Sequence, residues 1–227
     1  MKHIPYLMLL VAGSTSAQFA VVPYNDDNNA TDKRFAWGEN IGWVNFAPKT
    51  LTMLDLPYFD EHIASGFAWA ENAGWINLGN GAPADGFQYL NADASDFGVN
   101  IETDGALTGF AWAENIGWIN FGPFADLVTA DHHARIVLAE GRLRGFAWAE
   151  NVGWISFDSD EFNQFVRLRC LADTNFDGFV TSSDFIGWIA GFNDGRIECD
   201  QNRDGLCTPT DFTAWINNFS MGCLLNQ

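Results

Sequence analysis

Aromatic and apolar positions alternate with small or polar ones in four closely similar segments of the chain. The segments read RFAWGENIGWVNF at 34–46, GFAWAENAGWINL at 66–78, GFAWAENIGWINF at 109–121 and GFAWAENVGWISF at 145–157. Their starting points are about 32 to 43 residues apart, which is the spacing of an internal structural repeat. We therefore expect the first two-thirds of the protein to be built from repeated units.

Each segment predicts a β-hairpin in which two short strands flank a five-residue AENxG connection. Asn and Gly are the residues that supply the positive φ of such a connection. If the two tryptophans face each other, the third hairpin has Phe110, Trp112, Trp118 and Asn120 on one face and Gly109, Ala111, Ile119 and Phe121 on the other. Both faces are largely apolar, so we expect cover on two sides, as in stacked or radially packed sheets.

A further strand is predicted before the later copies, in FGVNIETDGALTGFAW and ARIVLAEGRLRGFAW, with turns at Asp104-Gly105 and Glu140-Gly141. The first copy lacks a clear leading strand, whereas QFVRLR at 164–169 follows the last copy without a hairpin of its own. If that strand pairs with the first hairpin, the array closes into a propeller-like or barrel-like ring. If it does not, the array is an open, solenoid-like stack. The fold class is a mostly β repeat domain followed by a small α domain.

The repeats contain eight of the ten tryptophans of the protein. One interpretation makes these side chains core residues, since each can bury a large apolar area. The other leaves some indoles exposed to stack on the sugar rings of a polysaccharide. In that case the loop residues that would hydrogen-bond hydroxyls are Glu39/Asn40, Glu71/Asn72, Glu114/Asn115 and Glu150/Asn151, although turn chemistry also explains these pairs.

The pattern changes to a helical one near the end of the chain. Apolar residues recur at i, i+3, i+4 and i+7 as Phe185, Trp188, Ile189 and Phe192, then as Phe212, Trp215, Ile216 and Phe219. Thr208 followed by Pro209 is a typical helix start. We expect two helices that bury these stripes against each other.

Each predicted helix follows a twelve-residue acidic loop, DTNFDGFVTSSD at 173–184 or DQNRDGLCTPTD at 200–211. Calcium takes six to eight oxygen ligands, and EF-hand-type loops supply them from positions 1, 3, 5, 7 (backbone carbonyl), 9 and 12, with Gly at 6. The predicted ligands are Asp173, Asn175, Asp177, Phe179, Thr181 and Asp184 in the first loop, and Asp200, Asn202, Asp204, Leu206, Thr208 and Asp211 in the second. The sequence therefore predicts two bound calcium ions.

This duplicated loop and helix, without the leading helix of a complete EF-hand, resembles the type I dockerin family over residues 170–223. The framing CLADTN and MGC segments are similar to the cysteine-framed dockerins of planctomycete-type bacteria. The resemblance implies anchoring to a cohesin-like or other surface receptor protein. It also implies partner contacts at loop positions 10 and 11, which are Ser182 and Ser183 in one half and Pro209 and Thr210 in the other.

All four cysteines lie in this tail, and an even count in an exported module favours two disulfides. Zinc is the competing interpretation, but the spacings lack a C-x-x-C pair and no His is nearby. Cys170 and Cys223 flank the duplicated unit, whose ends meet if its halves are related by a pseudo-twofold axis. We therefore pair Cys170 with Cys223 and Cys199 with Cys207.

Residues 1–17 have the features of a signal peptide, with Lys2 and His3 before an apolar run that is too short to span a bilayer. The expected domains are this segment, the β-repeat domain at 18–168 and the dockerin-like domain at 169–227. Removing residues 1–17 takes away Lys2 and no acid, so the formal net charge changes from −18 to −19. Such acidity disfavours nucleic acid as a partner, and we expect a secreted or cell-surface protein without a membrane span.

Sequence motifs give little support to catalysis. The chain lacks nucleophile-elbow, zinc-protease, Walker and dinucleotide patterns. Asp131-His132-His133 could bind a metal, but a solvated turn explains it better. We therefore expect a non-catalytic protein with a structural or ligand-binding β domain and a calcium-dependent anchoring module. The alternative is an extracellular hydrolase or carbohydrate-binding protein delivered by the dockerin-like module.

Overall fold

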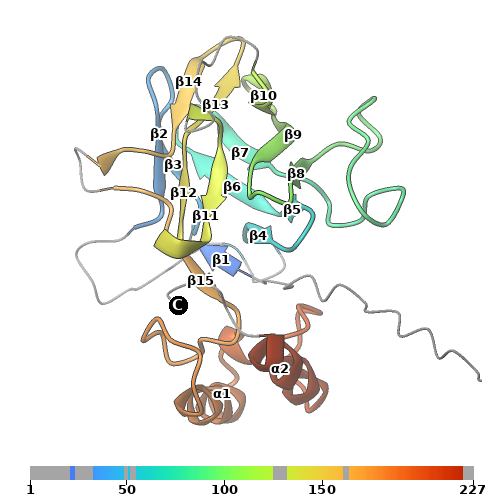
Figure 1. Ribbon diagram of the computed structural model, residues 1–227, viewed down its shortest axis with the longest axis vertical. Coiled ribbons are helices and arrows are strands. Elements are labelled where there is room, and N and C mark those ends of the chain that lie inside the picture. The colour runs from blue at the N-terminus through green and yellow to red at the C-terminus, as the bar shows by residue number, and fades with distance from the viewer. Residues whose placement is uncertain are drawn as a thin grey trace, which may run out of the picture.

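The computed structural model describes residues 21–23, 33–48, 51, 55–124, 132–160 and 164–221. Over these residues the chain is mostly β, with an eight-stranded antiparallel barrel and two C-terminal helices that lie below the barrel in Figure 1. The predicted signal peptide at 1–17 lies outside them. None of the described helices has the length and apolar character needed to cross a membrane.

Each tryptophan-rich segment forms an antiparallel hairpin. The hairpins are β2 (Phe35–Gly38) with β3 (Gly42–Asn45), β6 (Phe67–Ala70) with β7 (Gly74–Asn77), β9 (Leu107–Ala113) with β10 (Gly117–Gly122), and β13 (Phe146–Ala149) with β14 (Gly153–Ser156). They lie side by side in chain order, and the barrel closes where Ser156 of β14 pairs with Trp37 of β2. Of the arrangements left open by the sequence, the barrel is the one observed.

The leftover strand at 164–169 does not close the barrel. Val166 forms an isolated bridge with Arg34, just before the first hairpin, while β15 (Leu168–Cys170) pairs with β1 (Val21–Pro23). β1 also pairs with β4 (Tyr58–Phe59), which forms a small hairpin with β5 (Ala64–Ser65). The first and fourth hairpins of the barrel therefore meet directly.

Short strands precede the second, third and fourth hairpins. β4 and β5 come before β6, β8 (Val99–Ile101) pairs with β9, and β11 (Arg135–Val137) pairs with β12 (Arg142–Arg144) across the short helix η2 (Leu138–Glu140). The meander predicted before the third hairpin is thus present, whereas the strands before the fourth hairpin form a separate two-stranded sheet.

The barrel interior is filled by small and β-branched side chains facing each other across each hairpin. The pairs are Ala36/Val44, Ala68/Ile76, Ala111/Ile119 and Ala147/Ile155, all of them buried. An eight-stranded barrel has an interior just wide enough for side chains to fill, which suits this alternation of small and large residues. The residue before the glycine of each connection adds to the core as Ile41, Ala73, Ile116 and Val152, and the last residue of each repeat adds Phe46, Leu78, Phe121 and Phe157.

Glycine is required in each AENxG connection because its φ is positive, for example +73° at Gly42 and +83° at Gly117. The Asn of these connections is not among the described residues with positive φ, so it plays a different part from the one that turn chemistry predicts. Its side chain instead donates a hydrogen bond to the neighbouring hairpin.

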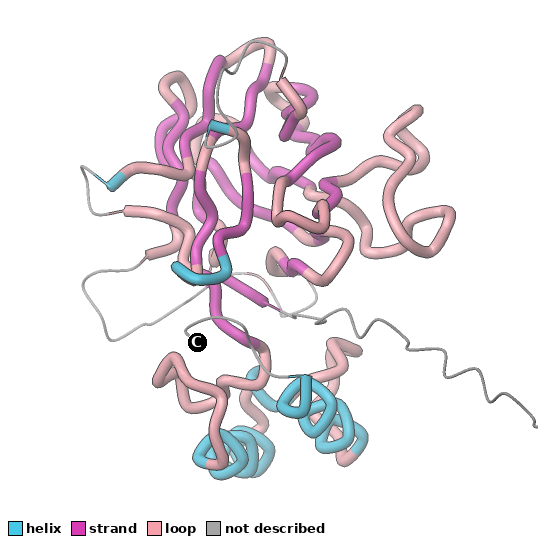
Figure 2. Tube along the Cα trace, in the orientation of Figure 1, coloured by secondary structure: helices cyan, strands magenta, loops and turns pink. Residues whose placement is uncertain are grey.

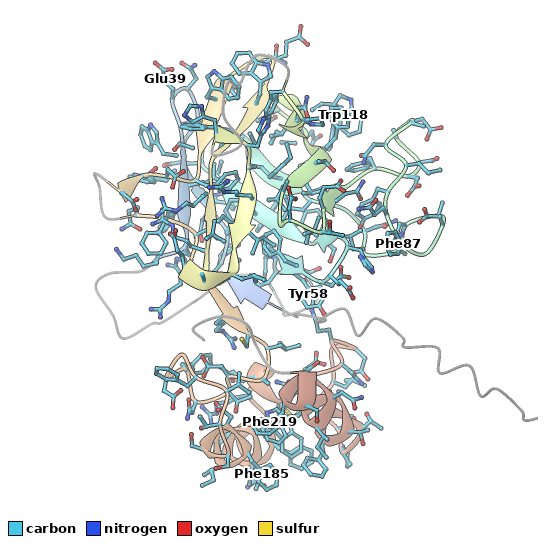
Figure 3. All side chains as sticks on the ribbon, in the orientation of Figure 1. Glu39, Tyr58, Phe87, Trp118, Phe185 and Phe219 are labelled. Atoms are coloured by element: carbon cyan, nitrogen blue, oxygen red, sulfur yellow. A yellow bond between two sulfur atoms is a disulfide. The ribbon has the colours of Figure 1, made fainter. Side chains whose placement is uncertain are left out.

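The tail contains helix α1 (Ser183–Asp194), the short helix η4 (Ile197–Cys199) and helix α2 (Thr210–Met221). Trp188 and Trp215 are buried as predicted. Phe185 packs on α2 with its ring centroid 5.4 Å from those of both Phe212 and Trp215, and Figure 3 shows it between the helices. The helical stripes are only partly buried, because Ile189 and Ile216 are 40% and 41% exposed.

The barrel and the tail each have a hydrophobic core, and Val180 packs against both. A second contact joins β4 to the second acidic loop. The guanidinium of Arg203 lies 4.0 Å from the ring centroid of Tyr58, and its Nη2 donates to the carbonyl oxygen of Leu56 at 3.3 Å. The tail is therefore packed against the end of the barrel at which Tyr58 lies (Figure 3).

Candidate functional site

The first acidic loop is folded around two buried carboxylates. Asp173 at position 1 is 1% exposed and Asp184 at position 12 is fully buried. Asp184 accepts hydrogen bonds from the backbone N–H groups of Thr174 at 3.0 Å, Asn175 at 3.2 Å and Thr181 at 2.7 Å. The two ends and the middle of the loop are thereby tied to one side chain.

The remaining positions of the first loop follow one local pattern. The N–H of Gly178 donates to Asp173 at 3.1 Å, that of Asp177 to Asn175 at 2.9 Å, and that of Phe179 to Asp177 at 2.9 Å. Each predicted side-chain ligand at positions 1, 3 and 5 is thus oriented by the backbone. Asn175, Asp177, Phe179 and Thr181 are exposed.

The second loop repeats this arrangement. Asp200 and Asp211 are buried, and Asp211 accepts from the backbone of Gln201 at 2.9 Å, Asn202 at 3.1 Å and Thr208 at 2.8 Å. The corresponding N–H groups of Gly205, Asp204 and Leu206 donate to Asp200, Asn202 and Asp204. Two segments that differ at half of their positions therefore fold with the same hydrogen bonds.

Burial affects the carboxyl group at position 1 of each loop. Burial, reinforced by Asp184 and Asp177, raises the pKa of Asp173 to about 6, while Arg169 partly opposes the shift. Burial also raises the pKa of Asp200, and Asp211 adds to that shift. Oδ1 of Asp173 is buried without a hydrogen-bond partner. A buried carboxylate oxygen without a partner is costly, so a cation at this position would lower the free energy of the folded loop.

The donor chemistry of both loops suits calcium, which prefers carboxylate, amide and backbone carbonyl oxygens. The predicted sets do not depend on carboxylates alone, since each includes Asn, Thr and a main-chain carbonyl. In the described ranges no three His, Cys, Asp or Glu side chains come close enough together to hold a metal ion by themselves. The fit of calcium thus rests on mixed oxygen donors and on the orphaned oxygen of Asp173.

A disulfide links the second loop to the residue that precedes it. Cys199 and Cys207 form a disulfide with a Cα–Cα distance of 5.5 Å, which is the pairing predicted for them. Cys170 is also disulfide-bonded. Its predicted partner Cys223 lies outside the described residues. A disulfide that spans positions preceding and within the second loop restricts the conformations of that loop before any metal binds.

The residues predicted to contact a partner are all at the surface. Ser182, Ser183, Pro209 and Thr210 are exposed. Ser183 Oγ accepts a bond from Asn175 Nδ2 at 2.9 Å, and Thr210 Oγ1 lies 2.6 Å from Thr208 Oγ1. These hydroxyls are therefore linked to predicted ligands of the loops.

The tryptophans of the barrel form a belt on its outer surface. Within each hairpin the two indoles face each other with centroids 4.7–4.9 Å apart in an edge-to-face arrangement. Seven of the eight are 36–41% exposed, and Trp37 is half-buried. The interpretation of these residues as core is therefore wrong, because the interior of the eight-stranded barrel is filled by smaller side chains, with Ala, Val and Ile in the facing pairs and Phe or Leu as the last residue of each repeat.

The loop residues Glu and Asn have separate roles at one rim of the barrel. Each Asn amide donates to a carbonyl in the neighbouring hairpin connection, from Asn40 to Val152 at 2.9 Å, Asn72 to Ile41 at 3.4 Å, Asn115 to Ala73 at 3.2 Å and Asn151 to Ile116 at 3.0 Å. These four bonds run around the whole rim. The Glu residues at 39, 71, 114 and 150 are exposed, and Figure 3 shows Glu39 at this rim.

The Asp131-His132-His133 segment is only partly described, since Asp131 lies outside the described residues. His133 stacks on Phe124 with centroids 5.9 Å apart, and His132 meets Phe146 edge-on at 6.3 Å. The two imidazoles thus pack against different aromatic rings.

A long loop between β7 and β8 contains a further candidate site that the motifs did not reveal. It projects from the barrel (Figure 2) and, together with β9 and β10, lines a cavity of about 410 Å³. The lining residues are Asn91, Ala92, Asp93, Ala94, Phe97, Phe110 and Trp118. One feature of the sequence could have indicated this site, because the Asp- and Asn-rich insertion is absent from the other intervals between hairpins.

Comparison with known proteins yields no match to a protein-family model, a curated protein or a solved structure.

Proposed function

We propose that this is an exported, non-catalytic protein whose barrel is anchored to a surface receptor by a calcium-dependent, dockerin-like tail. The observation that carries the proposal is the repeated scaffold of the two acidic loops. In both, position 1 and position 12 are buried carboxylates held by the same backbone N–H groups.

Calcium would be held in the first loop by Asp173, Asn175, Asp177, the Phe179 carbonyl, Thr181 and Asp184. In the second loop the equivalent residues are Asp200, Asn202, Asp204, the Leu206 carbonyl, Thr208 and Asp211. The ion would supply the positive charge that these clustered oxygens lack. Each loop leads directly into α1 or α2, so binding would order the helices that the receptor contacts.

The receptor-binding surface would combine Ser182 and Ser183 with Pro209 and Thr210, which lie at equivalent places in the two halves. Apolar residues adjoin them on the helices, since Ile186 is 70% exposed and Phe212 is 37% exposed. A surface with a hydrophobic centre and hydroxyl groups beside it is suited to a protein partner. A cohesin-like or other surface receptor is the proposed partner.

Calcium titration of the full chain tests the anchoring proposal. We expect the wild type to bind two ions, Asp184→Asn and Asp211→Asn to bind one each, and the double variant to bind none. Asp194→Asn is the matched control, because Asp194 is an exposed acid on α1 outside the loops. Failure of the wild type to take up Ca²⁺ at millimolar concentration would contradict the proposal.

A second candidate function for the barrel is binding to a polysaccharide, and the exposed tryptophan belt favours it. Contiguous exposed apolar surface on a soluble protein usually marks an interaction site. Screening the full chain on a glycan array and against a broad panel of hydrolase substrates separates this function from catalysis. Binding without turnover would support the non-catalytic proposal, and turnover that disappears on changing one carboxylate would overturn it.

A further inference from the structure

A cavity lies beside Trp118 of the third hairpin. Equivalent indoles occur in the other hairpins, and that of Trp154 in the fourth has the ring of Phe124 beside it, with centroids 5.3 Å apart. Phe97 from the insertion meets Trp118 edge-on with centroids 5.0 Å apart. Phe110 meets the same indole at 6.0 Å. Figure 3 shows Trp118 on the outside of the barrel, at the side from which the loop projects.

These three rings line one side of the cavity as an aromatic wall, in which the two phenyl rings pack edge to face with the indole. Their interplanar angles are 82° for Phe97 and Trp118 and 70° for Phe110 and Trp118, at distances of direct ring contact. A cage for a quaternary ammonium ion needs several ring faces around one empty point, and here the rings fill the space between themselves. A wall suits a flat ligand whose C–H bonds, with their partial positive charge, lie against an aromatic face.

The polar side of the cavity is provided by the insertion. Asp93 is exposed, and its Oδ1 accepts bonds from the Oγ and the backbone N–H of Ser95 at 2.6 and 2.8 Å. These bonds lower the pKa of Asp93, so the lining presents an ionised carboxylate. The lining contains no Lys or Arg, and the chain carries a formal net charge of −18. An anionic ligand is therefore disfavoured, whereas hydroxyl groups can donate to the carboxylate.

The insertion is fixed before any ligand arrives. Tyr89 is 3% exposed; its hydroxyl donates to Ala64 O at 3.3 Å and accepts from Gly81 N at 2.7 Å. The side chain of buried Asn100 bonds both the N–H and the carbonyl of Tyr89, at 2.8 and 2.9 Å. A rigid loop loses little conformational entropy on binding, which favours recognition of a weakly binding ligand.

The lining residues are themselves positioned by this network. Asn91 has a φ of +54°, and its Oδ1 accepts from the N–H of Gly98 at 3.1 Å. A side chain at Gly98 would collide with the ring of Tyr89. Asn91 thereby links the two ends of the segment that carries Asp93 and Phe97.

We propose that this cavity binds a pyranose ring of a neutral polysaccharide, with the exposed indole of Trp118 against one sugar face, Phe97 and Phe110 beside that indole, and Asp93 accepting from the sugar hydroxyls. This rests on the second function proposed above for the barrel. A cavity of about 410 Å³ lies within the size range of small-ligand sites. The belt continues from it, since Trp112 pairs with Trp118 within the hairpin, Asn77 of β7 is opposite Trp112, and Trp75 lies two residues before Asn77 on the same face of β7. A polymer can therefore extend from the cavity along neighbouring indoles.

Calorimetric titration of the full chain tests the proposal, with cello-, xylo- and mannohexaose as neutral probes, oligogalacturonate as the anionic probe and choline as the cationic one. We expect at least one neutral hexasaccharide to bind and oligogalacturonate not to bind. Asp93→Ala and Trp118→Ala should each weaken that binding at least tenfold. Trp43→Ala, at the equivalent position of a hairpin without the insertion, should weaken it less than threefold.

Circular dichroism identifies any variant that fails to fold, and Phe97→Ala, which changes only the loop side of the wall, then replaces Trp118→Ala. Equal losses for Trp43→Ala and Trp118→Ala would overturn the cavity proposal while leaving polysaccharide binding by the belt. If no saccharide binds, or if choline alone binds, both the cavity proposal and polysaccharide binding by the barrel would be overturned. Calcium uptake in the same samples reports separately on the anchoring function.

Discussion

The indole nitrogen of Trp188 donates a hydrogen bond to the carbonyl oxygen of Cys199, 3.1 Å away. Cys199 directly precedes Asp200, the first residue of the second acidic loop. The other half of the tail has the same arrangement, in which Trp215 donates to Ala172 at 3.2 Å, just before Asp173. The helix that follows each loop therefore supports the start of the opposite loop, and the two predicted calcium sites are mechanically connected.

Trp188→Phe should weaken calcium binding at the second loop more than at the first. Phenylalanine retains much of the aromatic packing but leaves the buried carbonyl of Cys199 without its donor, which we expect to cost about 1–2 kcal/mol. Calcium titration in the Asp184→Asn and Asp211→Asn backgrounds isolates each loop. Trp215→Phe should show the reverse preference, and equal effects of either variant on both loops would contradict the cross-support.

Removal of calcium should unfold the tail and leave the barrel folded. The core of the tail consists of few residues, so we expect metal and disulfides to provide much of its stability. Differential scanning calorimetry with and without chelator should show loss of one transition and retention of the other. A single transition that chelator does not change would count against this expectation.

Asn40→Ala should lower the free energy of unfolding of the barrel by about 1 kcal/mol. The amide of Asn40 joins the first hairpin to the fourth, at Val152. Glu39→Ala is the matched control, because Glu39 is exposed in the same connection and should change stability by less than about 0.5 kcal/mol. Urea unfolding of both variants measures the difference. Equal free energies of unfolding for the two variants would contradict a stabilising role for the hydrogen bonds between the hairpin connections.

Acid should remove a small part of the barrel's stability through Asp160. The hydrogen bond that Arg142 donates at 2.7 Å lowers the pKa of this carboxyl below its usual value. A lowered pKa stabilises the folded state above the unfolded value of about 3.9 and loses this contribution as pH falls through the folded value. Asp160 is half exposed, so solvent screens the pair and Asp160→Asn should cost less than about 1 kcal/mol at pH 7.

The difference between Asp160→Asn and wild type should shrink as the pH falls below the unfolded value of about 3.9 toward the lowered pKa of Asp160. Thermal unfolding between pH 7 and pH 3 measures it. Glu150→Gln is the control, since Glu150 is exposed in the connection of the fourth hairpin and its replacement should change the free energy of unfolding at pH 7 by less than about 0.5 kcal/mol. A difference that grows on acidification would contradict the assignment.

The hairpins could be predicted from the sequence because their information is local. Alternation of small and aromatic residues gives the two faces, and the AENxG connection gives the turn. The face that became the interior could not be predicted from hydrophobicity, since Trp112 and Ile119 are both apolar. The width of the barrel decided it, because alanine opposite a β-branched residue fits the interior and an indole does not.

The acidic loops could be predicted from the sequence because the spacing of their predicted ligands is fixed within twelve residues. Ile189 and Ile216 were expected in the tail core and are partly exposed, because Trp188 and Trp215 with their neighbouring phenylalanines already fill it. The cavity at Trp118 was not predicted. Its walls come from Phe97 and Phe110, which are close only after the insertion has folded back on the barrel.

Closure of the barrel has a kinetic consequence. Each hairpin joins residues close in sequence, whereas the bond between Asn40 and Val152 spans 112 positions. Contacts between distant residues form late in folding, and until they form, β2 and β14 each leave a row of unpaired backbone groups. During synthesis the ring stays open until the fourth hairpin has emerged, and in that interval the open edges can pair with those of a second chain. The yield of refolded monomer should therefore fall as protein concentration rises.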